Sequence, residues 1–414
     1  MSGLPTDFAA AMDRLEPFEP RPAVAVAVSG GADSSALAIL TRDWVRPRGG
    51  SILGLVVDHG LRPTSADEAR LTIERLARYG IPARLLPLAN LTPGPALAER
   101  ARAMRYDALT QACRDASILH LLLGHHAADQ IETLAMRVLR GSRTHGLACM
   151  TAIRETATLR LLRPLLTIEP VHLRRWLTAN GTAWIEDPSN TDIRALRPRL
   201  RRHLAAPHPA NPALSQAISA VGRLRAQQEA ATAAELAQRA TIRPEGFAVL
   251  SPGRIGASAL SRLIQTIGGA PYPPDPEQID DLAMHPRPAT LAGVRIMPAG
   301  RLAEGMLILR EPAATLPPIP AHRNAIWDRR FRLTACPDLP ATAEIGRLGQ
   351  DAARFRHRSN LPSVILQTLP AIRIDGHLAA VPHLGYKASP AGATVTVLFT
   401  PSQPAAGACF VPSP

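Results

Sequence analysis

The fold is decided by residues 23–40, which read AVAVAVSGGADSSALAIL. Residues 23–28 form a short run of alanine and valine, which is typical of a strand buried on both faces of a parallel sheet. A Ser-Gly-Gly turn follows, and the pattern of residues 34–42 predicts a helix. A glycine-rich turn between a buried strand and a helix can present backbone N–H groups to an anion.

Further strands and helices alternate outward from this stretch. We expect strands at residues 51–57 and 118–123, and helices at residues 64–79, 96–114 and 126–140. Such alternation predicts an α/β domain with a doubly wound, mostly parallel sheet. After about residue 202 the pattern changes, and a long helix is expected at residues 213–240.

A chain of 414 residues is too long for one ordinary core, so we expect several domains. Two proline-rich stretches, residues 206–212 and 312–323, indicate linkers. We predict an α/β domain at residues 1–205, a helical linker at 206–240, a small mixed domain at 241–312, a proline-rich linker at 313–325 and another small α+β domain at 326–414.

The composition narrows the class of protein. Hydrophobic residues make up 46% of the chain, and no apolar run approaches the roughly 20 residues that span a bilayer. The first 20 residues carry Asp7, Asp13, Glu16 and Glu19 and do not look like a signal peptide, so we expect a cytoplasmic protein without membrane contact. The four cysteines form no C-x-x-C pair, which argues against a zinc site or a redox dithiol.

The net charge of +13 indicates a polyanionic partner, although every basic residue except Lys387 is arginine, a bias that codon usage alone can produce. Local clustering is more informative than the total. Nine consecutive positions without an acid hold Arg194, Arg197, Arg199, Arg201 and Arg202. Such a local excess predicts an anion-binding surface.

The turn after the first strand suggests which anion it binds. Gly30 and Gly31 allow close approach of the backbone, which suits a phosphate. Asp33 would repel that phosphate unless a magnesium ion lies between them, since magnesium accepts carboxylate and phosphate oxygens together. The turn lacks the G-x-x-x-x-G-K-S/T lysine and the G-x-G-x-x-G spacing, which argues against a motor, a GTPase or a dehydrogenase. A structural turn with a capping serine is the simpler alternative.

Residues 29–34, SGGADS, resemble the SGGxDS signature of the PP-loop ATP pyrophosphatases. The resemblance implies an adenine nucleotide alpha hydrolase-like fold, cleavage of ATP between its α- and β-phosphates, and transfer of AMP. It also implies that Asp33 helps to hold magnesium and that pyrophosphate is bound by Ser29, Gly30, Gly31, Ala32, Asp33 and Ser34.

Six further segments resemble the tRNA(Ile)-lysidine synthase family in order and spacing. They are VVDHGLRP (56–63), ARAMRYDAL (101–109), GHHAADQIET (124–133), MRVLRGS (136–142), RPLL (163–166) and WIEDPSN (184–190). The likeness covers residues 22–203 and is looser beyond them. It implies a ligase that adenylates the 2-carbonyl oxygen of the wobble cytidine in an isoleucine tRNA with a CAU anticodon. The amine of free L-lysine then displaces AMP and gives lysidine.

The resemblance also implies roles for single residues. Asp129 would be catalytic and would hold magnesium together with Asp33. The lysine would be bound by Arg105, Asp129 and Glu132. The tRNA would be contacted by Arg197, Arg199 and Arg201 and by the domain at residues 241–312.

Considered without the resemblance, the residue types on the predicted helix at 126–140 also favour a site for a cation. Asp129 and Glu132 are three residues apart and share a helix face. Another face is mostly occupied by Ile131, Leu134, Ala135, Val138 and Leu139. We therefore expect the two carboxylates at the mouth of the sheet rather than in the core, where they suit an ammonium group or magnesium. A solvated helix face with a capping His-Asp pair is the alternative. His125 and His126 are expected to be structural, since no further zinc ligands are spaced with them.

Three positions depart from the family's pattern. Val56 stands where many members have histidine, Ala128 replaces the first acid of HHxDDQ, and Pro198 interrupts the R-N-R pattern after WIEDPSN. These departures concern the side chains around them and leave the predicted ATP site intact.

Three other functions are weighed against this one. A tRNA thiolase usually needs paired cysteines, which the chain lacks. An amide-forming ligase that uses ammonia would not need the basic C-terminal half. A non-catalytic tRNA-binding descendant would not need to keep Asp33, Arg105, Asp129 and Glu132. The sequence leaves a homodimer open.

Overall fold

The computed structural model describes residues 3–88, 91, 94, 96–142, 144–156, 158–186, 199–200, 211–335, 339–388 and 395–412. The chain forms two compact units: unit 1 holds residues 1–227 and 408–414, and unit 2 holds residues 228–407. It therefore passes between the units twice, once within α9 (Asn211–Arg239) and once between Gly407 and Ala408. The finer five-part division expected from the sequence stays a prediction.

Unit 1 is built on a six-stranded sheet with the strand order β3-β2-β1-β4-β6-β5. The strands are β1 (Ala23–Ala27), β2 (Ser51–Asp58), β3 (Ala83–Pro87), β4 (His120–Leu122), β5 (Ile153–Glu155) and β6 (Arg160–Leu162). All neighbours pair in parallel except β5 and β6, which are antiparallel. The doubly wound, mostly parallel sheet is thus confirmed.

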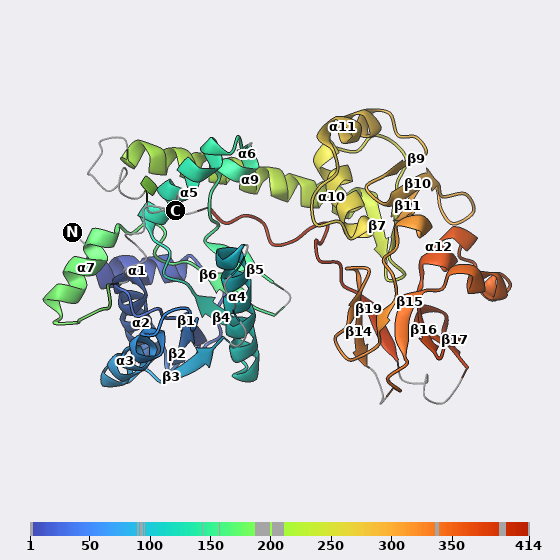
Figure 1. The fold of residues 1–414 in the computed structure, drawn as a ribbon. Coiled ribbons are helices and arrows are strands. Elements are labelled where there is room, and N and C mark those ends of the chain that lie inside the picture. Colours follow the sequence, from blue (N-terminus) through green and yellow to red (C-terminus); the bar gives the residue numbers. More distant parts are fainter. Residues whose placement is uncertain are drawn as a thin grey trace. The chain divides into compact units, whose positions relative to one another are not determined.

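Helices cover both faces of this sheet (Figure 1). One core includes residues of α1 (Leu4–Asp13), α2 (Ala32–Val45), α3 (Ser65–Arg78) and α7 (Pro170–Ala179), and α4 (Leu97–Asp115) contributes to a core on the other face. Val24 and Val26 of β1 belong to the first core and Ala25 to the second, and none of the three is exposed. This two-sided burial explains why the strand is an unbroken apolar run.

The order of the strands reverses between β1 and β4. Strands β2 and β3 lie beyond β1, whereas β6 and β5 lie beyond β4. In doubly wound sheets, ligands bind outside the carboxyl ends of the strands at such a reversal. The SGGADS turn follows β1, and α5 (Ala127–Leu139) follows β4, so the topology brings these two motifs to the same place. The short helix α6 (Thr144–Leu147) comes next.

Unit 2 begins with an antiparallel sheet in the order β7-β8-β11-β10-β9. Its strands are β7 (Ala240–Arg243), β8 (Phe247–Leu250), β9 (Ala289–Leu291), β10 (Val294–Pro298) and β11 (Met306–Arg310). Helices α10 (Ala257–Gly268) and α11 (Pro276–Met284) share a core with Ala248 and Ile308, which alternate along their strands with residues of a second core. That second core joins Phe247 and Leu309 to α12 (Ser363–Thr368).

Two further sheets complete unit 2. The first has the order β12-β15-β16-β17-β18 and the second β13-β14-β19. Their strands are β12 (Ile319–Pro320), β13 (Ile326–Trp327), β14 (Phe331–Ala335), β15 (Glu344–Arg347), β16 (Pro370–Ile374), β17 (His377–Val381), β18 (Tyr386–Lys387) and β19 (Thr396–Phe399). Smaller α+β structure after the α/β domain was expected, and the structure forms it with antiparallel sheets. Of the helices that the structure describes, none is both long and apolar enough to cross a bilayer.

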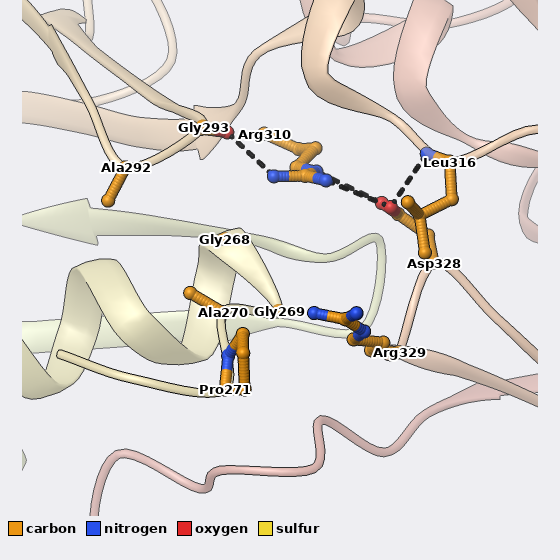
Figure 2. Close-up of a pocket in the computed structure, with 10 residues that line it drawn as sticks. All are labelled: Gly268, Gly269, Ala270, Pro271, Ala292, Gly293, Arg310, Leu316, Asp328 and Arg329. Carbon is orange, nitrogen blue, oxygen red and sulfur yellow. Dashed lines mark hydrogen bonds and ion pairs between the residues drawn. The ribbon is translucent and has the colours of Figure 1, made fainter. Parts of the chain in front are cut away.

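The buried carboxylate of Asp328 bonds to several segments of unit 2. The side chain of Asp328 is fully buried and accepts hydrogen bonds from Arg310 Nη2 at 3.0 Å, from Arg330 Nη2 at 2.7 Å and from the Leu316 N–H at 3.0 Å. Figure 2 shows Arg310 and Asp328 facing each other. Both residues line a cavity of about 230 Å³. Burial lowers the pKa of Arg330 to about 10, and Asp328 opposes this shift.

Candidate active site

The SGGADS turn forms a compact cradle at the start of α2. Gly31 immediately precedes the helix, and Gly30 has a φ of 83°, a left-handed conformation that favours glycine. Ser34 Oγ accepts a hydrogen bond from the Ser29 N–H at 3.1 Å and donates one to the Gly31 carbonyl at 3.2 Å. These bonds fix the turn at the helix start, where the first N–H groups lack carbonyl partners within the helix.

Three neighbouring segments pack closely against this turn. A Cβ atom on Gly30 would lie 2.4 Å from Thr72 Oγ1, and one on Gly124 would lie 3.3 Å from Ser34 Cα. Ile185 donates its N–H to the Gly30 carbonyl at 2.9 Å, so the start of WIEDPSN contacts the turn. The remainder of that motif, residues 187–190, lies outside the described residues.

His126 lies between the two carboxylates that the sequence assigns to magnesium. Its Nε2 atom is 3.5 Å from Asp33 Oδ2, and its Nδ1 atom is 3.6 Å from Asp129 Oδ2. The ring also caps α5: the Asp129 N–H donates to Nδ1 at 3.4 Å, and Asp129 Oδ2 accepts from the His126 N–H at 3.0 Å. The capping His-Asp pair is therefore present, and the same ring connects α5 to the turn after β1.

The exposure of the α5 side chains does not follow the division into a polar and an apolar face. Asp129 and Glu132 are only 7% and 2% exposed, whereas Val138 and Leu139 are 58% and 67% exposed. The first turns of α5 are enclosed because the helix starts at the carboxyl end of β4, where Gln130 bonds to Met150. The last turn extends into solvent. A carboxylate in a buried, less polar setting attracts a cation more strongly than one in water, so this pair suits a cationic ligand.

Asp33 has the features of a magnesium ligand. Its Oδ1 atom is buried and has no hydrogen-bond partner among the described residues. A buried carboxylate oxygen without a donor is costly unless a cation binds it. No group of three or more histidine, cysteine, aspartate or glutamate side chains could hold a metal ion in the described part of the chain. That is compatible with magnesium, which usually takes one or two carboxylates together with phosphates and water.

Arg105, on α4, lies near His59 at the carboxyl end of β2. Burial lowers the pKa of the Arg105 guanidinium, with Tyr106 opposing the shift and Arg102 adding to it. Burial also lowers the pKa of His59, the charge of Arg105 lowers it further, and Asp58 opposes the shift. A partly buried cation thus lies at the same edge of the sheet as Asp33 and Asp129, and its fork suits a carboxylate ligand.

Arg163, in the RPLL segment, is a buried arginine that bonds to the segment before β5. It is 6% exposed and donates from Nη1 to the Thr151 carbonyl at 2.9 Å. Burial lowers the pKa of Arg163, and Tyr106 opposes the shift. Sequence reasoning gave no role to Arg163, nor did it place His126 between two carboxylates. The only sequence signal for the latter was the His-Asp pair at a predicted helix start.

The predicted tRNA-contacting arginines are only partly within the described residues. Arg199 is described and is exposed, whereas Arg197, Arg201 and the departing Pro198 lie outside. Of the other two departures, Val56 is 2% exposed and packs in the core of unit 1, and Ala128 is half-buried.

The two buried cysteines of unit 1 are poor nucleophiles. Burial raises the pKa of Cys113 to about 12 and that of Cys149 to about 11, and nearby Arg137 partly offsets the latter shift. Both stay protonated near neutral pH, and the thiolate is the reactive form. These two thiols therefore give no support to sulfur transfer.

Residues 5–207 match the family model of the PP-loop domain, so unit 1 contains an ATP-binding domain of that class. The tRNA(Ile)-lysidine synthase of Ruegeria pomeroyi is 34% identical over 89% of this chain and 90% of its own length. That of Hyphomonas neptunium is 36% identical over 73% of this chain and 85% of its own length. The chain belongs to the tRNA(Ile)-lysidine synthase family. Among solved structures, a U34-tRNA thiolase of Methanococcus maripaludis matches 53% of this chain and 78% of its own, with 16% identity and a TM-score of 0.44.

Proposed function

We propose that this chain ligates free L-lysine to the 2-position of the wobble cytidine of isoleucine tRNA with a CAU anticodon, using ATP. One observation carries the assignment of the site. Asp33 and Asp129 meet through His126 at the reversal of the sheet order, where two helices begin. Nucleotide-binding sites in doubly wound folds form at this position.

The first step joins the cytidine to AMP. The 2-carbonyl oxygen of the base attacks the α-phosphorus of ATP, the bond to the β-phosphate oxygen breaks, and pyrophosphate leaves. The turn formed by residues 29–34 would hold the departing pyrophosphate at the start of α2, where N–H groups favour an anion. Magnesium bound by Asp33 and Asp129 would neutralise the charge that develops on the phosphates.

The second step transfers lysine. Its amine attacks C2 of the cytidine, the bond from C2 to the adenylated oxygen breaks, AMP leaves with that oxygen, and the amine loses a proton. Asp129 and Glu132 would bind the amino group, and Arg105 would bind the lysine carboxylate as a two-pronged donor. Because both carboxylates are buried, their attraction for a cation is stronger than it would be in water.

The arginine cluster would position the tRNA. Arg197, Arg199 and Arg201 would contact phosphates, which fix the register of an RNA without reading its sequence. Aromatic residues make up only 4% of the chain, so recognition would depend on arginine and on the shape of the folded RNA rather than on an extended stacking platform.

The test is incorporation of radiolabelled lysine into tRNA, with ATP and magnesium each omitted in turn. Label in isoleucine tRNA that requires both supports the proposal, and methionine tRNA with the same anticodon serves as the control. Absence of label, accompanied by tRNA-dependent AMP formation, would overturn lysine as the nucleophile while leaving adenylation in place.

A further inference from the structure

Residues 408–412 lie against unit 1 although they follow unit 2 in the chain. Phe410 is 5% exposed, and the guanidinium carbon of Arg225 lies 4.5 Å from the centre of its ring. Gly222, on the same helix as Arg225, makes room for this packing. A Cβ atom there would lie 3.2 Å from Phe410 Cε1 and 3.0 Å from Pro412 Cβ. The segment therefore occupies a fitted position on α9.

Val411 is joined to unit 1 through its backbone. Its N–H donates to Thr151 Oγ1 at 3.0 Å, and its carbonyl accepts from the Ala152 N–H at 2.8 Å. The Thr151 hydroxyl in turn donates to the Ile153 carbonyl at 2.6 Å. The Val411 side chain packs against the main core of unit 1. Val411 thus holds the segment immediately before β5, next to Phe410, which packs on α9.

That segment is bonded to α5. Gln130 Nε2 donates to the Met150 carbonyl at 3.0 Å, and the Met150 N–H donates to Gln130 Oε1 at 2.9 Å. Gln130 is 3% exposed and lies on α5 between Asp129 and Glu132. Rotation of α5 about its axis would break both bonds of a buried amide, which is costly. Met150 therefore helps to fix the direction in which the two carboxylates point.

Arg225 links α9 to α6 as well as to Phe410. Its guanidinium packs on the Phe410 ring, and its Nη1 donates to the His145 carbonyl of α6 at 2.9 Å. From α5, Arg137 Nη1 donates to the Cys149 carbonyl at 3.0 Å. The positions of α5, α6, residues 149–152, α9 and residues 408–412 thus depend on one another.

The stretch before residues 408–412 is anchored within unit 2. The Gln403 carbonyl accepts a hydrogen bond from Thr266 Oγ1 at 2.8 Å. Ala405 is 8% exposed and belongs to the core formed with α10 and α11. Residues 400–412 therefore make contacts at both ends, unlike a chain terminus that is not tied down and frays.

We propose that residues 408–412 position the lysine site. Phe410 anchors them on α9, Val411 holds the segment before β5, and that segment fixes α5 through Gln130 and so orients Asp129 and Glu132. The identity of the ligand rests on the proposed function, whereas the placement of α5 does not. Phe410 and Val411 act as positioning residues and need no contact with substrate.

The experiment compares Thr151→Val, which removes the hydroxyl that accepts the Val411 N–H, with Thr151→Ser, which keeps it. We expect Thr151→Val to raise the KM for lysine about fivefold, the effect of losing the hydrogen bond to the Val411 N–H at typical net strength. The KM for ATP should rise less, because Asp33 and the turn at residues 29–34 are unaltered. Thr151→Ser should behave as the unaltered protein. Phe410→Ala should repeat the effect of Thr151→Val through a different contact.

Amide hydrogen exchange of α5, measured without substrates, provides a second readout. We expect faster exchange around Gln130 in Thr151→Val and Phe410→Ala, and not in Thr151→Ser. Unchanged exchange and an unchanged KM for lysine in both variants would overturn the proposal, as would equal rises in both KM values with a lowered melting temperature. If the unaltered protein incorporates no lysine, the proposed function fails, and the exchange comparison still decides the role of the segment.

Discussion

His126 Nε2 lies 3.5 Å from Asp33 Oδ2 and thereby connects the start of α5 to the start of α2. The two residues follow different strands, β4 and β1, on either side of the reversal in strand order. Because the other nitrogen of the same ring faces Asp129, one imidazole sets the spacing of both carboxylates. The structure thus gives the second histidine of GHHAADQ a place in the predicted magnesium site.

Replacement of His126 distinguishes its role as the cap of α5 from its contact with Asp33. Asparagine is a good helix cap but is too short to reach Asp33, so His126→Asn should keep the melting temperature and lower the rate of lysine incorporation about 10- to 100-fold. His126→Ala should lose activity to a similar degree and also about 1 kcal/mol of stability, because the cap is removed. Full activity in His126→Asn would show that the contact with Asp33 has no catalytic importance.

Removal of the Asp33 carboxylate should slow the reaction severely and leave the binding of RNA largely intact. Asp33→Ala takes away a charge worth several kcal/mol to the developing negative charge, so single-turnover lysine incorporation should fall on the order of 100- to 1000-fold. Affinity for tRNA, measured by filter binding, should stay within about twofold because the turn is not part of the arginine cluster. Undiminished turnover in this variant would refute the magnesium role.

The arginine cluster should contribute to the salt dependence of tRNA binding. Replacing Arg197 and Arg199 together by glutamine should weaken binding, and the slope of log affinity against log salt should become shallower by roughly 0.7 to 0.9 for each lost phosphate contact. Arg254→Gln, at an exposed arginine of unit 2 outside the cluster, is the comparison for general loss of charge. An unchanged slope in the double variant would exclude the cluster from the RNA interface.

The buried Asp328 should be essential for the stability of unit 2. Asp328→Asn would leave Arg310 and Arg330 buried without a compensating charge, which should cost about 3–5 kcal/mol of unfolding free energy. Asp281→Asn is the matched control, because its ion pair with Arg287 lies at the surface, where solvent screens it. Denaturant melts of both variants test this expectation, and similar midpoints for the two would contradict it.

Three histidines should make the folded chain less stable as the solution becomes acidic. Burial lowers the pKa of His59, His120 and His383 below their ordinary value of 6.5. As the pH falls through 6.5, the unfolded chain takes up protons before the folded chain does. The free energy of unfolding should therefore decrease from there down to the lowered pKa values. Thermal melts across this range should show the decrease, and His383→Gln should reduce it; a variant with an unchanged slope would remove His383 as a contributor.

Local patterns predicted the central elements of unit 1. The apolar run of β1 and the periodicity of α3 and α5 are properties of the segments themselves, so their bounds agree with the structure to within about two residues. The sequence did not reveal β3, β5 and β6. Only Leu86 is buried in β3, so it lacks an alternating pattern, and β5 and β6 are three residues long.

Local sequence patterns did not predict contacts between segments that are distant in the chain. The sequence placed the apolar residues of α5 on one face, but Val138 and Leu139 at the end of that face are exposed. The burial of Asp129 depends on what encloses the first turn, which includes the partner of Gln130 twenty residues further on. Asp328 and Arg310 come from different strands and connections, and no spacing rule pairs them.

The position of Val411 in the chain also sets an order of assembly. During synthesis, residues 1–227 emerge first, yet the bonds that Thr151 and Ala152 make to Val411 require a segment translated after all of unit 2. Domains generally fold as they leave the ribosome, from the N-terminal end onward. The nascent α/β domain therefore lacks its hydrogen bonds to Val411 until more than 180 further residues have been translated. A ribosome that stalls within unit 2 would release a nucleotide-binding domain that lacks its closing segment.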